Sequence, residues 1–310
     1  GASPSSPTLE PEEEVSFSPE EEKKEKPPPY AVAMYPWARN LIRPIQTIPN
    51  PSRETILFWH IPKSGGTTAK DLYKCMGKQI DVESRRQEIL ESKNLGVISS
   101  GAVDIVFSSF PGFALKNLVD SNHKVRAVGM FRHPVDRLVS KFYYLQVATW
   151  ERTYNPSWKD MDILEWAQSV NSDNNHMVKK LAGKIQTDKA TRRDFILAKT
   201  TLRGRFVIGL MHEMEESIKR FNVVMGIDNE DCERCKGCMN IYFGEDGKKK
   251  QNSNPHPDVG KDSPAWKLLA EKNRYDIQLY EYAVQLFDEQ KERIDSYASM
   301  ISNQYSVTPQ

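Results

Sequence analysis

One short stretch of the chain combines the residue types that bind phosphate. It contains, in order, Lys63, Ser64, Gly65, Gly66, Thr67 and Thr68. At a strand-to-helix turn, free backbone N–H groups and the positive end of the helix dipole favour an anion. The glycines let the backbone approach the ligand, the hydroxyls donate hydrogen bonds, and the lysine adds a full charge. Because the lysine precedes the glycines, the order is not that of a Walker nucleotide loop.

A second stretch, residues 132–144, has the composition of another phosphate site. Arg132 follows an apolar segment, and Pro134 suits the first turn of a helix, where its missing N–H has no intrahelical partner. Ser140 lies about two turns into that helix. Alone, each stretch is also compatible with an ordinary strand-to-helix turn. Together they indicate one ligand with phosphate groups at both ends, at the carboxyl edge of a sheet.

The segments around these stretches predict the elements that position them. Four apolar segments are typical of strands in a parallel sheet: residues 55–61, 103–107, 125–131 and 206–210. Helical spacing occurs at residues 69–76, 81–93, 160–170, 174–181, 189–203, 212–225 and 266–297. We therefore expect an α/β fold: a mainly parallel sheet with flanking helices and a P-loop-like strand–loop–helix that binds phosphate.

Composition divides the chain into two parts. Residues 1–50 are rich in Pro, Ser and Glu and cannot bury enough apolar surface to offset their ordering entropy, so we expect a disordered stem or linker. Residues 51–305 are expected to form the folded domain. A net charge of +1 argues against a general nucleic-acid-binding surface. The sequence shows neither a signal peptide nor an apolar run near eighteen residues, although a membrane anchor could lie outside it.

The two stretches resemble motifs of the sulfotransferases that use phosphoadenosine phosphosulfate (PAPS), in particular the Golgi-type carbohydrate enzymes of the heparan 2-O and chondroitin groups. Residues 60–68 resemble the loop that binds the 5′-phosphosulfate, and residues 132–144 resemble the 3′-phosphate motif. The similarity extends over roughly residues 55–290. It implies that residues 51–305 are a sulfotransferase domain, which moves a sulfuryl group from PAPS to a hydroxyl or amine and releases the bisphosphate PAP without a catalytic metal.

The resemblance also implies roles for individual residues. Lys63 would offset charge on the leaving phosphate, and residues 64–68 would hold the 5′-phosphate. Arg132 and Ser140 would bind the 3′-phosphate, which ATP lacks. The implied acceptor is a carbohydrate or a small molecule. The implied location is the Golgi lumen, with the cytoplasm as the alternative.

The general base is where the sequence departs from this family. Carbohydrate members often carry a histidine in a Gly-His-Phe-Pro pattern, where this chain has serine at Ser109. Serine is no base at neutral pH without help. The candidates for the base are Asp104, ranked first, and then His60, His123 and His176.

Three cysteines, Cys232, Cys235 and Cys238, lie in an expected insertion loop at residues 228–257, and the fourth is Cys75. Two disulfides are the favoured interpretation, although the sequence does not fix their pairing. A zinc site would need a fourth ligand, from Cys75, His256 or Asp231. An iron–sulfur cluster has the least support.

Several alternatives stay open. The same loop could belong to an ATP-dependent kinase of a small molecule, although it lacks Walker order. The chain could also be a non-catalytic binding protein on a transferase scaffold, although it keeps Lys63, Arg132 and Ser140. An aromatic group is expected to belong either to the core or to an acceptor cleft: Trp150, Tyr154, Trp158 and Trp166.

Overall fold

One parallel sheet carries the candidate site. In the computed structural model, which describes residues 50, 53–83, 85–118, 123–151, 153–169, 174–227, 232–244 and 256–306, five strands form a sheet of order β2-β3-β1-β4-β5. The strands are β1 (Glu54–Trp59), β2 (Ile80–Glu83), β3 (Ile105–Ser108), β4 (Lys124–Phe131) and β5 (Phe206–Leu210). All four strand pairs are parallel. The expected α/β fold is confirmed, and the expected stem lies almost wholly outside the described residues.

The central strand β1 shows why these segments form a sheet with two covered faces. Five of its six residues are buried, as expected for a strand between two helical layers. Leu57 and Trp59 pack into one apolar cluster, while Phe58 packs into the cluster on the opposite face. Because successive side chains of a strand point to opposite faces, β1 contributes to two apolar cores, one on each face of the sheet.

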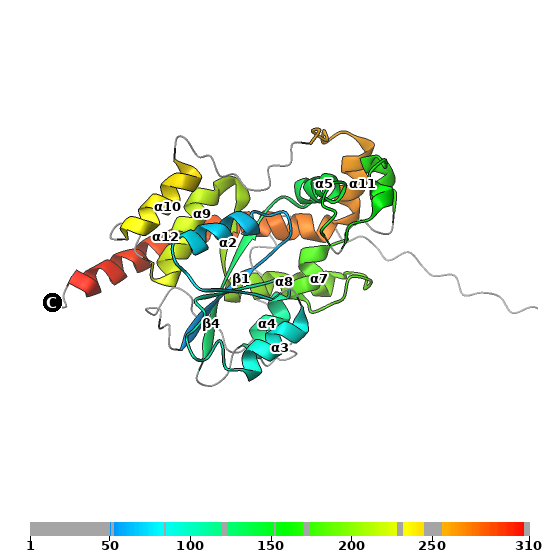
Figure 1. The fold of residues 1–310 in the computed structure, drawn as a ribbon. Helices are drawn as coiled ribbons and strands as arrows, with labels where there is room; N and C mark the ends of the chain where they lie inside the picture. Colours follow the sequence, from blue (N-terminus) through cyan, green and yellow to red (C-terminus); the bar gives the residue numbers. More distant parts are fainter. Residues whose placement is uncertain are drawn as a thin grey trace, which may run out of the picture.

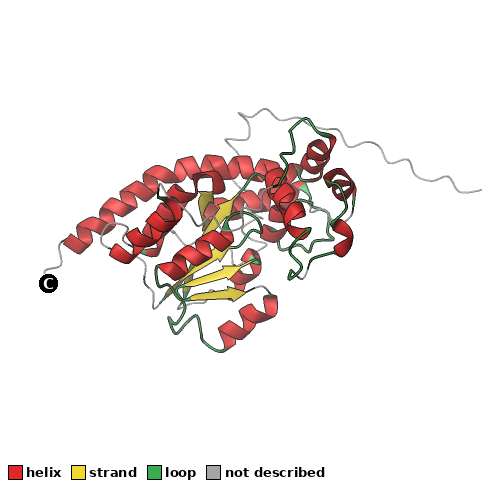
Figure 2. Ribbon diagram, turned by 45° about the horizontal axis from the view of Figure 1, so that its top comes forward, coloured by secondary structure: helices red, strands yellow, loops and turns green. Residues whose placement is uncertain are grey.

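Helices cover both faces of the sheet (Figure 1). On one face lie α2 (Gly66–Cys75), α9 (Met214–Met225) and α10 (Glu233–Phe243). On the other lie α3 (Arg86–Asn94), α4 (Pro111–Asn117), α7 (His176–Leu181) and α8 (Arg192–Arg205). The long α12 (Arg274–Ser306) runs past the edge strand β5 and contributes to both cores (Figure 2). No described helix is long and apolar enough to cross a membrane.

A third apolar cluster lies beside the sheet and includes the helix of the second stretch, residues 132–144. It is built by α5 (Pro134–Leu145), the short 3-10 helix η2 (Pro156–Trp158), α6 (Ile163–Gln168) and α11 (Pro264–Lys272). Trp158 and Trp166 are buried in this cluster, so they belong to the core. Trp150, in contrast, is 74% exposed.

The starts of α7 and α12 hold each other in place. The buried Asp276 carboxylate accepts hydrogen bonds from the backbone N–H groups of Met177 and Val178, both at 2.9 Å. In return, the side-chain oxygen of Asn175 accepts from the backbone N–H of Tyr275 at 2.9 Å. Orphan N–H groups at both helix starts thus gain partners, which fixes the angle between the two helices.

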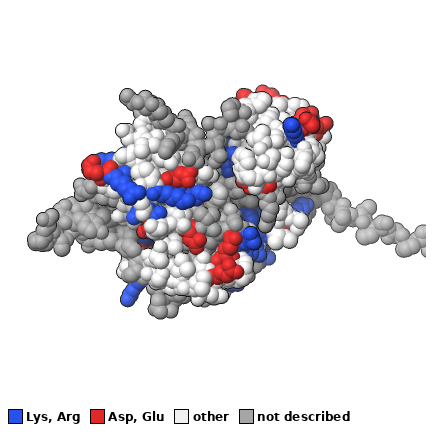
Figure 3. Space-filling view, viewed as in Figure 1, with Lys and Arg blue, Asp and Glu red and all other residues white. Residues whose placement is uncertain are grey.

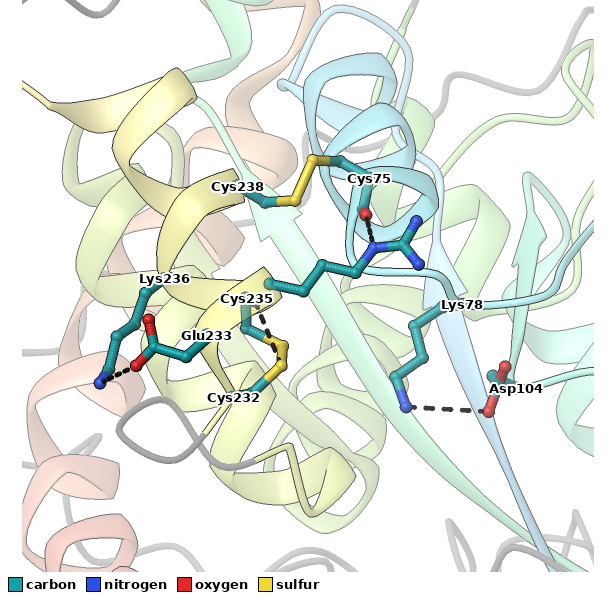
Figure 4. The surroundings of a disulfide bond; sticks show 9 residues. Cys75, Lys78, Asp104, Cys232, Glu233, Cys235, Lys236 and Cys238 are labelled. Atoms are coloured by element: carbon teal, nitrogen blue, oxygen red, sulfur yellow. Dashed lines mark hydrogen bonds and ion pairs between the residues drawn. A yellow bond between two sulfur atoms is a disulfide. The ribbon is translucent and has the colours of Figure 1, made fainter.

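The cysteine-containing segment is helical where the structure describes it, rather than a loop as expected. A disulfide between Cys75 and Cys238 joins α10 to the end of α2, and a second joins Cys232 to Cys235 at the start of α10 (Figure 4). The disulfide interpretation is confirmed. Among the described residues no group of three or more metal-binding side chains is placed to hold an ion, and the bonded cysteines leave no thiolate for zinc.

Other differences from expectation are local. Residues 80–83 form the edge strand β2, although residues 81–93 were expected to be one charged helix; only α3 fulfils that expectation. The expected helix at 266–297 is divided into α11 and α12. On the surface, Lys and Arg side chains gather over α2 and α10 (Figure 3). Acidic neighbours pair with some of them, for example Glu233 with Lys236 at 3.0 Å, so this surface is mixed in charge.

Candidate active site

The sheet topology brings the two motifs together. β1 and β4 are neighbouring parallel strands, so the loop after β1 and Arg132 after β4 emerge at the same edge. The Arg132 guanidinium Nη1 donates a hydrogen bond to the backbone oxygen of Lys63 at 3.2 Å. Residues 69 positions apart in the sequence thus meet at one point.

The loop backbone is shaped around a short turn. Lys63 has φ 65° and Gly65 has φ 81°, both in the left-handed region. For a lysine this conformation costs about 1–2 kcal/mol relative to the right-handed one. A Cβ atom on Gly66 would lie 2.3 Å from the Cδ2 atom of His60, so only glycine fits there. A lysine held in a conformation that favours glycine indicates that its side chain is needed at this position.

Ser64 adds a feature that a ligand would complete. Its side chain is buried, and its hydroxyl has no hydrogen-bond partner among the described residues. An unsatisfied buried hydroxyl costs about 1–3 kcal/mol. It lies just before the N-terminus of α2, which has no side-chain cap. An anion at this helix end would accept hydrogen bonds from the hydroxyl and from the free backbone N–H groups, so the residues present fit a phosphate group.

Three cations converge at this edge. Burial lowers the pKa of Lys63, and the nearby charge of Arg132 lowers it further. Burial also lowers the pKa of Arg132; Asp136 opposes this shift, while Arg137 adds to it. Arg137 is fully buried at the base of α5. Like charges this close disfavour one another. A ligand with several negative charges would attract each of these cations and so offset the repulsion between them.

Ser140 and His133 extend the edge along α5. Ser140 lies two turns into the helix, as expected, with only 7% of its surface exposed. His133 stacks on Trp266 with ring centroids 5.4 Å apart and meets Tyr280 edge-on at 5.6 Å. Its buried Nδ1 atom lacks a partner within the part of the chain that the structure describes. His133, Trp266 and Tyr280 therefore form a cluster of aromatic rings beside Arg132.

The structure separates the candidate bases. Asp104 precedes β3, at the opposite edge of the sheet from Lys63, about 13 Å of strand away. Its carboxylate accepts from the backbone N–H of Gln79 at 2.7 Å and lies 3.9 Å from the Lys78 ammonium. This position corrects the expectation that Asp104 serves as the base, because it reaches neither the loop nor a ligand there.

The candidate histidines also differ in how close they lie to the loop after β1. His123 lies at the amino end of β4, where its Nε2 atom is 2.8 Å from the Thr55 hydroxyl oxygen. His176 begins α7. His60 is next to the loop, and burial, with a smaller contribution from Lys70, lowers its pKa. It is therefore neutral at physiological pH, and its contact with Gly66 gives it a role in shaping the loop.

The structure also adds side chains that the sequence analysis did not single out. The Lys63 ammonium lies 4.0 Å from the ring centroid of Tyr144, a cation–π contact. The Tyr144 hydroxyl donates to the Glu151 carboxylate at 2.8 Å. Tyr144 belongs to residues 132–144, the second stretch of the sequence analysis. No spacing in the sequence predicts that Glu151 lies near Lys63, because their proximity depends on the turn after α5.

Comparison with models of protein families identifies a family for this chain. A sequence model described as the sulfotransferase family matches residues 50–283, a range that includes all five strands, the loop after β1 and residues 132–144. A search of curated proteins finds no match.

Proposed function

The chain belongs to the sulfotransferase family, and from this premise we propose that it transfers a sulfuryl group from PAPS to a hydroxyl of a carbohydrate acceptor and releases PAP. The observation that carries the donor is the carboxyl edge of the sheet: at a helix N-terminus, the buried Ser64 hydroxyl has no partner among the described residues, and Arg132 hydrogen-bonds to the neighbouring Lys63 backbone. Two phosphate-bearing ends of one nucleotide would satisfy both motifs at once.

The protein's own residues have distinct tasks in this reaction. Ser64 and the N–H groups at the start of α2 hold the 5′-phosphate, and Arg132 with Ser140 holds the 3′-phosphate. Lys63 hydrogen-bonds to the oxygen that bridges phosphorus and sulfur. As the bond from sulfur to this oxygen breaks, the phosphate keeps the electron pair, and the ammonium stabilises the new charge. Positioning and electrostatics do most of the work in transfers of this kind.

Calorimetric titration with adenosine 3′,5′-bisphosphate tests the donor, with ATP–magnesium as the comparison. We expect tight binding of the bisphosphate, weaker binding of ATP, and a loss of about tenfold or more for Arg132→Ala, since a charged hydrogen bond contributes about 1.5–3 kcal/mol. Arg203→Ala is the matched control, because Arg203 pairs with Glu289 at 2.8 Å on an exposed surface. Preference for ATP, or equal losses in both variants, would overturn the proposal.

We also propose an oxidising compartment, the Golgi lumen, as its location. The support is the pair of disulfides, since such bonds persist in oxidising compartments and are rare in the cytosol. If thiols are blocked before cells are opened, peptide mapping should recover both disulfides intact. Four free thiols would favour the cytoplasmic alternative.

A further inference from the structure

The turn after α5 returns the chain to the catalytic lysine. Backbone hydrogen bonds run from the N–H of Ala148 to the oxygen of Tyr144 and from the N–H of Glu151 to the oxygen of Ala148, both at 3.0 Å. The N–H of Tyr154 then donates to the Glu151 oxygen at 2.9 Å. These bonds fix the turn through its backbone alone, so the side chains of Trp150 and Glu151 are not needed to form it.

The Glu151 side chain is nevertheless held in one place. Its carboxylate accepts the Tyr144 hydroxyl at 2.8 Å, and the same tyrosine ring lies under the Lys63 ammonium at 4.0 Å. Burial raises the pKa of Tyr144, and the hydrogen bond to Glu151 adds to this, so the phenol keeps its proton and remains the donor. One tyrosine therefore positions a carboxylate next to the lysine that faces the leaving group.

Two further observations place this carboxylate near the reacting groups. The charge of Glu151 acts to raise the pKa of both Lys63 and His60, which lie on the phosphate loop. The neighbouring Trp150 is 74% exposed and meets Tyr144 edge-on at 6.3 Å. An exposed indole beside a carboxylate is a surface on which a sugar ring can stack while one of its hydroxyls is hydrogen-bonded.

From this geometry we infer that Glu151 is the general base of the reaction, positioned by Tyr144, and that Trp150 is the wall against which the acceptor sugar packs. Glu151 takes the proton of the acceptor hydroxyl while the hydroxyl oxygen forms its bond to sulfur and the bond from sulfur to the bridging oxygen breaks. The carboxylate thus fills the role for which Ser109 is unsuited. The inference rests on the proposed function, because it assumes PAPS as the donor.

The test compares two acceptors with different needs for a base. Methyl β-D-glucopyranoside has alkyl hydroxyls that must lose a proton, whereas p-nitrophenol is already ionised at mildly alkaline pH. With PAPS as donor, Glu151→Gln should slow transfer to the glucoside about a hundredfold or more and change transfer to p-nitrophenolate little. The affinity for adenosine 3′,5′-bisphosphate should not change. Glu289→Gln, which removes an exposed carboxylate on α12, is the matched control and should change neither reaction.

Companion variants separate the three roles. Glu151→Asp should recover part of the rate, since it keeps a carboxylate. Tyr144→Phe removes only the hydroxyl and should lower kcat for the glucoside with less effect on its KM. Trp150→Ala should do the reverse and raise KM, because it removes binding that is the same in the ground state and the transition state.

The other possible results of the two-acceptor assay would contradict the inference. Equal losses with both acceptors would make Glu151 structural, and no loss would exclude it as the base. A wild-type protein that binds the bisphosphate but transfers sulfuryl to neither acceptor would overturn this inference alone. If the bisphosphate does not bind, the proposed function fails first and the inference fails with it.

Discussion

Glu54 and Arg126, at the amino-terminal edge of the sheet, form an ion pair with N···O 2.9 Å in which both side chains are almost completely buried. Arg126 also donates to the Tyr297 hydroxyl at 3.2 Å. At the opposite edge, the nearby charge of Arg132 adds to the burial that lowers the pKa of Lys63, and the buried Ser64 hydroxyl lacks a hydrogen-bond partner among the described residues. The same strands thus begin at a buried ion pair and end where burial and like charge both lower the pKa of a lysine.

This difference separates residues that stabilise the fold from residues that serve a ligand. A buried pair leaves no group unsatisfied, so its loss is felt in stability. A lysine beside an arginine and a buried hydroxyl without a partner among the described residues cost the protein stability, and such features persist where a ligand completes them. Substitutions at the two edges should therefore change different measurements.

The largest effect is expected at the amino-terminal edge. Glu54→Gln leaves the Arg126 charge buried without its counterion, which typically costs about 3–5 kcal/mol. We expect the free energy of unfolding, measured by denaturant titration, to fall by this amount, while the folded fraction binds adenosine 3′,5′-bisphosphate as before. If the Glu54→Gln variant were as stable as the unmodified chain but lost nucleotide binding, the amino-terminal edge would serve the ligand rather than the stability of the fold.

At the carboxyl edge we expect the opposite pattern. Lys63→Gly removes the ammonium but accepts φ 65° without strain. Sulfuryl transfer should fall by about a hundredfold or more, while the midpoint of thermal unfolding should not decrease. The matched control is Lys291→Ala, which removes an exposed ammonium that pairs with Asp295 on α12. Alanine replaces glycine in this control because glycine would destabilise the helix. Near-normal turnover of Lys63→Gly would contradict the assignment of the donor site.

A moderate effect should appear in the pH dependence of binding. Burial and Arg132 lower the pKa of Lys63, so in the free protein the lysine loses its charge at a lower pH than an ordinary lysine does. An anionic nucleotide binds best to the charged form. Calorimetry should therefore show the affinity for the bisphosphate falling with rising alkalinity, beginning below the usual range of lysine. Lys63→Met should bind more weakly and lack this pH dependence.

The smallest effect is expected for Asp104→Asn. The carboxylate is 40% exposed, and exposed ion pairs contribute about 0–1 kcal/mol. Its hydrogen bond with the Gln79 backbone can be kept by the asparagine oxygen. Stability and turnover should both stay close to those of the unmodified chain. A large loss of turnover alone would restore Asp104 as a catalytic candidate.

The sequence predicted those features that depend on local pattern. The apolar segments matched the central strands, and β5 has the expected bounds at residues 206–210. The meeting of the loop with Arg132 followed from strand polarity in a parallel sheet. Strand polarity also explains the error at Asp104: a residue that precedes a strand lies at the edge away from the loops that follow neighbouring strands.

Other features could not be predicted because they depend on tertiary contacts. The edge strand β2 is short and carries Asp81 and Glu83, so its charges made a solvated helix the better expectation. Pairing with β3 overrides that preference. The position of Glu151 depends on how the turn after α5 closes onto Tyr144, seven residues earlier. No periodicity reports such a contact.

The disulfide from α2 to α10 has a consequence for biosynthesis. Its two cysteines are 163 residues apart, so Cys75 leaves the ribosome long before Cys238 exists. Of the three pairings that four cysteines allow, two would join Cys75 to Cys232 or to Cys235. Early closure of the short Cys232–Cys235 ring removes both wrong partners and leaves Cys238 alone for Cys75. Formation of the local bond would then prevent mispairing of Cys75, and the long bond cross-links α2 to a part of the chain that is synthesised much later.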